Sequence, residues 1–142
     1  MELTYAFLAN SAEMSSDGKL YLMGADFNRL LGTYPLTLQS MSLIVKMVFP
    51  PEECNREYHF SAEFIAPDGS RLEPYFERNI SPSVPDEPDR KSSLIILLAI
   101  NGMTFPTAGT YDVRVLLDGE EKKNLRLYAL EVPQKNAENQ SA

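Results

Sequence analysis

The feature that most constrains this chain is a series of short segments with β-type patterning, and no long segment with helical periodicity interrupts them. The clearest is Glu57–Ala66, in which Tyr58, Phe60, Ala62 and Phe64 alternate with polar residues. Seven or eight segments are predicted as strands. The others are Glu2–Asn10, Lys19–Leu30, Leu36–Phe49, Arg71–Phe76, Ser92–Asn101, Thr110–Asp118 and Lys122–Val132.

Turn signals separate these segments. The dipeptides Asp17–Gly18, Asp68–Gly69 and Asp118–Gly119 each stand between two β-like runs. Gly24 suits a bulge or bend, and Pro74 marks Arg71–Phe76 as an edge strand. Many short strands joined by such turns predict an all-β fold, an antiparallel β-sandwich of about seven to nine strands. We expect one domain over residues 1–133 and a flexible tail over residues 134–142.

The stretch "FPTAGTYDVRV" resembles a corner found in immunoglobulin and fibronectin domains, where a tyrosine begins a late strand and its hydroxyl bonds to upstream backbone. Phe105, Pro106, Gly109 and Tyr111 are the structural residues of this corner. The resemblance implies an immunoglobulin-like sandwich and a buried Tyr111.

Composition narrows the classes of partner. A chain of 142 residues with 44% apolar residues can bury a core, and its one cysteine cannot form an internal disulfide. Twenty acidic and thirteen basic residues give a net charge of −7, which disfavours nucleic acid. No signal-peptide pattern opens the sequence, and no apolar run approaches the ~18 residues of a membrane span. We therefore expect a cytoplasmic protein without a membrane or nucleic-acid partner.

Reactive chemistry has little support in the sequence. The single Cys54 has an acidic neighbour, which disfavours its thiolate, and the single His59 lies on the polar side of its strand. Both are predicted to be plain surface residues. No nucleophile-elbow, phosphate-loop or dinucleotide-binding pattern is present. We expect no catalytic residue, no cofactor and no enzyme activity.

The sequence gives little support for a metal site. One histidine and one cysteine do not suggest a zinc site. Calcium could use Asp17, Asp68 and Asp118, but alternating strand directions put Asp68 at the opposite end of the sandwich from the other two. A second conceivable cluster is Asp86, Glu87 and Asp89. No metal residue is predicted.

The run "LIILLAI", Leu94–Ile100, is apolar on both faces, whereas a sandwich strand normally exposes one face to water. Two explanations stay open. Either this is a central strand whose outer face is covered by the proline-rich loop Ser81–Lys91, or the outer face binds another protein. In the second case the partner surface comprises Leu94, Ile95, Ile96, Leu97 and Leu98.

Two longer stretches, "YAFLANSAEMSSDGKLYLMGADFNRL" and "NGMTFPTAGTYDVRVLLDGEEKKNLRLYALEV", together resemble a family of small uncharacterised bacterial proteins. The shared features are a Gly-Lys-Leu turn into a glycine-containing strand and a Phe-Pro…Gly-x-Tyr corner before an Asp-Gly hairpin. The resemblance implies a bacterial cytoplasmic β-sandwich and no known functional residues.

Two functions from different classes follow from these observations. The first is a non-enzymatic interaction or assembly module, which binds a protein partner or a second copy of itself. The alternative is a small-ligand-binding or hydrolytic domain with a carboxylate-lined pocket. Inward-facing acids with raised pKa values would favour the alternative.

Overall fold

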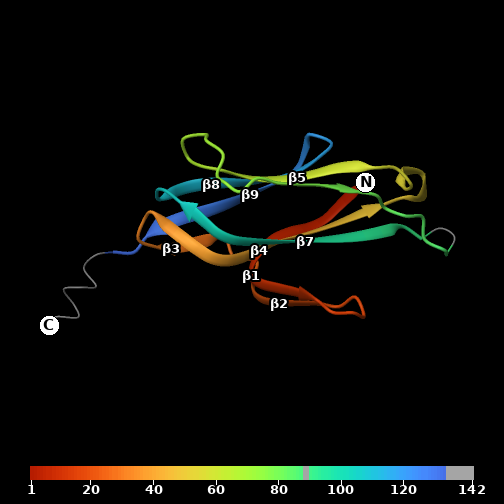
Figure 1. Ribbon diagram of the computed structural model, residues 1–142, viewed down its shortest axis with the longest axis horizontal. Helices are drawn as coiled ribbons and strands as arrows, with labels where there is room; N and C mark the ends of the chain where they lie inside the picture. Colours follow the sequence, from red (N-terminus) through yellow and green to blue (C-terminus); the bar gives the residue numbers. More distant parts are fainter. Residues whose placement is uncertain (88–89, 134–142) are drawn as a thin grey trace.

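The computed structural model describes residues 1–87 and 90–133 and shows a β-sandwich (Figure 1). The first sheet has the strand order β2-β1-β4-β7, and these strands span Leu20–Ala25, Glu2–Met14, Leu36–Phe49 and Ser92–Phe105. The second sheet has the order β3-β9-β8-β5-β6, with strands at Arg29–Gly32, Glu120–Glu131, Gly109–Leu117, Tyr58–Ile65 and Phe76–Ile80. A short 3-10 helix, η1 (Pro51–Glu53), links β4 to β5. The predicted all-β sandwich of seven to nine strands is confirmed. The predicted flexible tail, residues 134–142, lies outside the described residues.

The prediction of a single strand over Lys19–Leu30 is wrong, because this segment forms β2 and β3 in different sheets. Gly24 has a φ of 60°, as expected for a bend, and the chain then leaves the first sheet. Asp26 has a φ of 61°, and its amide donates to the carbonyl of Leu8 at 2.7 Å. Beyond this turn, β3 pairs in parallel with the end of β9. The remaining strand pairs of the described chain are antiparallel.

The predicted edge strand Arg71–Phe76 is also wrong in its position. Arg71 makes a single bridge to Ile65, and the regular strand β6 begins only at Phe76. Pro74 has no backbone N–H to contribute to a ladder, which explains why pairing with β5 starts after it. The edge of the second sheet is therefore formed by the segment that follows the proline.

The core lies between the two sheets and is rich in aromatic side chains. Its largest fully buried members are Tyr111, Phe49, Phe60, Phe64 and Phe105. The rings of Phe105 and Tyr111 meet edge to face with centroids 5.1 Å apart, a favourable aromatic geometry. Within the described residues, no helix has the length and apolar character needed to cross a membrane.

The corner before β8 has the arrangement that the sequence predicted for Tyr111. Its side chain is buried, and its hydroxyl donates to the Thr107 carbonyl at 2.7 Å and accepts from the Thr107 amide at 3.2 Å. Gly109 has a φ of 146°, and a Cβ at this position would lie 2.7 Å from Cγ of Pro67. The glycine therefore allows the chain to pass close to a neighbouring loop and to place the tyrosine in the core.

Candidate functional site

The apolar run Leu94–Ile100 lies in β7, and its alternation divides it into two sets. Ile96 and Ile100 are each 1% exposed, and Leu94 and Leu98 pack against the same core. Ile95 and Leu97 point to the outer face of the first sheet and are partly exposed. The prediction that one set faces the core is confirmed. The core-facing set is the even-numbered one.

β7 is an edge strand, so the first of the two explanations for Leu94–Ile100, a central strand covered by the proline-rich loop, is wrong about its place in the sheet. It pairs with β4 from Ser92 to Phe105 without a register shift, and no strand of the described residues lies on its other side. All fourteen residues of β7 are uncharged. Natural edge strands are usually protected by charged residues, prolines, bulges or covering segments. β7 contains no charged residue, no proline and no register shift.

The described part of the proline-rich loop Ser81–Lys91 lies at the beginning of β7. Its residues line a shallow hollow together with Ser92 and Ser93, and Pro82 accepts a backbone hydrogen bond from Asn55 at 2.8 Å. Pro88 and Asp89 lie outside the described residues. The described loop residues therefore leave Ile95 and Leu97 partly exposed.

A second exposed apolar surface lies in β2 and was missed in the sequence. Tyr21, Leu22 and Met23 are 56%, 36% and 72% exposed. In Figure 1, β2 and the end of β1 project below the two layers as a two-stranded ribbon. A signal was present, because Leu20–Met23 is apolar on both faces, as Leu94–Ile100 is.

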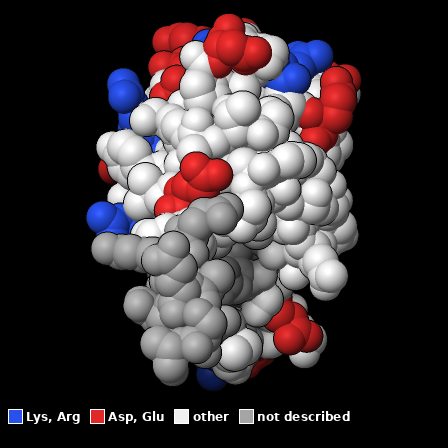
Figure 2. Space-filling model, turned by 90° about the vertical axis from the view of Figure 1, so that its left-hand side faces the viewer, with Lys and Arg blue, Asp and Glu red and all other residues white. Residues whose placement is uncertain are grey.

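A third apolar cluster lies where β3 pairs with the end of β9. Leu31 is 67% exposed and pairs with Leu130, which is 39% exposed. Figure 2 views the molecule from the side that carries β3, where charged side chains border a broad uncharged surface. This cluster belongs to the second sheet, whereas β7 belongs to the first.

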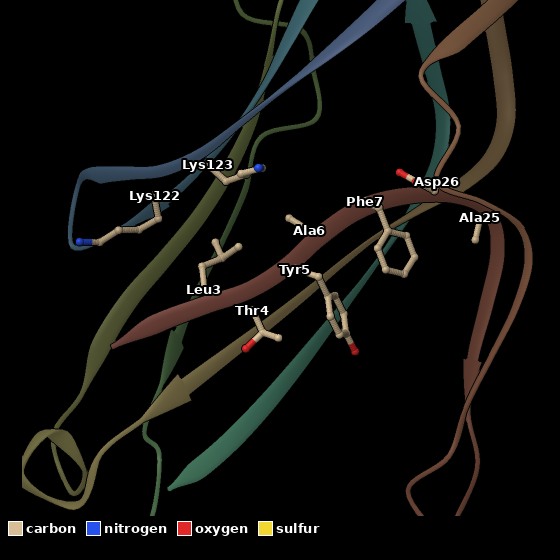
Figure 3. A pocket seen from close by; sticks show the side chains of 9 residues that line it. All are labelled: Leu3, Thr4, Tyr5, Ala6, Phe7, Ala25, Asp26, Lys122 and Lys123. Carbon is tan, nitrogen blue, oxygen red and sulfur yellow. The ribbon is translucent and has the colours of Figure 1, made fainter.

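The side of the sandwich between β1 and β9 has a hollow of about 630 Å³ (Figure 3). Leu3–Phe7 of β1 form one wall, and Lys122 and Lys123 of β9 lie across from them. Asp26 is the single carboxylate in its lining, and Lys122 forms an ion pair with Glu120 at 3.3 Å. This lining holds no pair of carboxylates for acid–base catalysis.

The carboxyl groups with displaced pKa values lie in exposed turns. Hydrogen bonds from Ser15 and Ser70 lower the pKa values of Asp17 and Asp68, respectively. Glu63, which is largely shielded from solvent, forms ion pairs with Arg114 and Arg71. The pKa values of Asp17 and Asp68 are thus displaced downward, opposite to the direction expected for acids that line a catalytic pocket.

The structure does not join Cys54 and His59 in one site. His59 lies on the exposed side of β5, where Nδ1 is 3.2 Å from Asn79 Oδ1 and Nε2 is 3.7 Å from Glu77 Oε2. The expectation that Cys54 is a surface residue is wrong. It is 8% exposed, and its Sγ lies 3.4 Å from the Pro50 carbonyl oxygen, because η1 turns the loop inward.

Because His59 is exposed and Cys54 is buried, substitutions at these two residues should lower the free energy of unfolding by different amounts. We expect His59→Ala to change the free energy of unfolding by about 0.5 kcal/mol or less, since the side chain is exposed. Cys54→Ser should cost on the order of 1 kcal/mol, because a hydroxyl would replace a thiol in a buried position. Urea denaturation of both variants measures the difference. Equal stabilities would contradict the burial assigned to Cys54.

The aspartates of the three Asp–Gly turns lie apart. Asp118 accepts from the His59 amide at 2.8 Å near the beginning of β5, whereas Asp68 follows the end of that strand. Asp17 lies at the tip of the projecting ribbon, which leaves no shared position for a calcium ion. Among the described residues, no three His, Cys, Asp or Glu side chains are placed to hold a metal ion together. Asp89, of the other conceivable cluster, lies outside these residues.

The fold and surfaces together define a β-sandwich domain whose most distinctive features are exposed apolar strands. The chain belongs to a family of unknown function, DUF6941, whose family model matches residues 4–130. No curated protein matches the chain.

Proposed function

We propose that this protein is a non-enzymatic interaction module of the bacterial cytoplasm that binds a partner protein along β7. One observation carries the proposal: a fourteen-residue edge strand without a charged residue. The free backbone edge of such a strand can accept an extended segment of another protein, and main-chain hydrogen bonds then contribute affinity. The partly exposed Ile95 and Leu97 would supply side-chain contacts beside the added strand.

The neighbouring outer face of the first sheet supports this assignment. Leu97 pairs with the fully buried Ile44, and Ile95 pairs with Lys46, whose Nζ lies 5.9 Å from the centroid of the Tyr5 ring. A cation on the ring face is held by the π electrons. The surface beside β7 is thus mainly apolar, with one anchored positive charge. A partner segment with apolar residues and an acidic residue near Lys46 would match it.

The experiment is affinity capture from a lysate of the native cell, followed by mass spectrometry. Leu97→Arg should remove the partner that the parent protein captures, because arginine places a charge in the middle of the contact. Leu31→Arg, on the other sheet, is the matched control and should capture the same partner. Equal capture by the parent and by Leu97→Arg would contradict the proposal.

A further inference from the structure

The side of the sandwich between β1 and β9 has a free backbone edge in each sheet. β1 pairs with β2 only from Ala9 onward, so no strand of the described residues lies beside the edge of its first half that faces away from β4. β9 pairs with β3 only from Tyr128 onward, which leaves the edge of its earlier residues without a neighbouring strand of the described chain. Backbone donors and acceptors on both edges are therefore open to an added chain.

The hollow between these edges is part of a longer groove. A second hollow, of about 250 Å³, extends it along β9 as far as Tyr128. The two hollows share Phe7, Asp26 and Lys123 in their linings, and together we call them the side groove. At a strand rise of ~3.3 Å per residue, the stretch of β9 from Lys122 to Tyr128 is roughly 20 Å long. The side groove therefore has the length of a short extended peptide.

The side groove is positively charged, although the whole chain has a net charge of −7. Three cationic side chains of β9 line it, Lys122, Lys123 and Arg126. Asp26 is the single carboxylate in the two linings. This local excess of positive charge favours an anionic ligand.

Lys123 is the cation best placed to bind such a ligand. It pairs with Val115, which is 1% exposed, and alternation puts it on the core-facing side of β9 together with Leu127. Among the described residues Lys123 forms no ion pair, whereas the neighbouring Lys122 pairs with Glu120. Figure 3 shows the side chain of Lys123 extending into the hollow from β9. Its ammonium group is thus available to a carboxylate of a ligand.

We infer that the side groove binds an extended acidic segment of another protein, with a carboxylate of that segment at Lys123. Apolar side chains of the segment would contact Leu3 and Ala6, which lie on the β9 side of β1 in Figure 3. Charge complementarity selects this occupant, and lysines on a free edge oppose pairing with the same edge of a second copy. The inference is independent of the proposed role of β7, because β4 separates β7 from β1 in the first sheet.

Selection of a phage-displayed library of random peptides on the immobilised full chain tests the inference. We expect the enriched peptides to contain more aspartate and glutamate than the unselected library, in alternation with apolar residues. The most enriched peptide, synthesised with a fluorescent label, should bind more weakly as the salt concentration rises. A library that yields no binder, or binders without an excess of acidic residues, would overturn the inference.

Fluorescence anisotropy of this peptide with variants of the full chain locates the site. Lys123→Gln should raise the dissociation constant roughly tenfold, because a charge-assisted hydrogen bond is lost. Asp26→Asn should lower it, because the groove then has no carboxylate to repel the peptide. Lys19→Gln is the matched control, since it removes one positive charge from an exposed turn outside the groove, and it should bind like the parent. The three substituted side chains are exposed, so circular dichroism should show folded proteins.

The variants also separate the side groove from β7. Leu97→Arg should bind the peptide like the parent. Parent-like binding by Lys123→Gln, weaker binding by Asp26→Asn, or an equal loss with Lys19→Gln would each overturn the inference. If Leu97→Arg abolishes binding and Lys123→Gln does not, the peptide occupies β7. In that case the side-groove inference fails while the proposed function of β7 stands.

Discussion

Ile96→Arg should unfold the domain, whereas Leu97→Arg, one residue further, should leave it folded. Ile96 is 1% exposed between the sheets, so an arginine there would lose the burial of the isoleucine and place an unpaired charge in the core. The expected cost is roughly 5 kcal/mol or more, comparable with the whole stability of a small domain. Leu97 lies on the outer face, where the arginine stem can follow the sheet and its head can reach water. The expected cost there is about 1 kcal/mol.

Thermal unfolding by circular dichroism measures both variants. Two folded variants, or two unfolded ones, would show that the division of β7 into an inner and an outer face is wrong. Comparing the two variants also separates the effect of an introduced charge on folding from its effect on partner binding. Ile96→Arg acts through folding, whereas Leu97→Arg should act through loss of the partner alone.

Tyr111→Phe should lower the free energy of unfolding by about 1–3 kcal/mol. The ring would stay buried, but the hydroxyl both donates to and accepts from the backbone of Thr107, so the substitution leaves two backbone groups without this partner. Urea denaturation provides the measurement. Tyr128→Phe is the control, because that side chain is 40% exposed and should change stability by about 0.5 kcal/mol or less. An unchanged midpoint for Tyr111→Phe would show that the corner depends on packing alone.

The sequence by itself predicted the fold class and several local features. Alternation in Glu57–Ala66 indicated β5, with Phe60 and Phe64 in the core, and the Asp–Gly pairs indicated hairpins. These predictions succeed because period-2 patterning and turn chemistry are local properties of the chain. The buried position of Tyr111 followed from the resemblance of its surroundings to the tyrosine corner of immunoglobulin and fibronectin domains. The sequence also indicated that Leu94–Ile100 is apolar on both faces.

Which sheet each strand joins was decided only by the tertiary structure. Lys19–Leu30 has the pattern of one strand, but the turn at Asp26 sends its second half to pair in parallel with β9. Cys54 appeared exposed beside two glutamates, but η1 turns its side chain inward. For β3 the deciding contact is with residues distant in sequence, whereas Cys54 makes its polar contacts with the nearby carbonyl groups of Pro50 and Pro51.

For the candidate surfaces, too, the sequence predicts one part and the tertiary structure decides the other. Leu94–Ile100 of β7 and Leu20–Met23 of β2 are apolar on both faces, and alternation determines which side chains share a face. Position in the sheet does not follow from alternation, because an edge strand and a central strand with the same side chains have the same pattern. The order β2-β1-β4-β7 makes β7 an edge, and the end of pairing between β1 and β4 at Ala9 makes the ribbon of β1 and β2 a projection. Both depend on where pairing stops, which is set by long-range backbone hydrogen bonds rather than by the side chains of the strand itself.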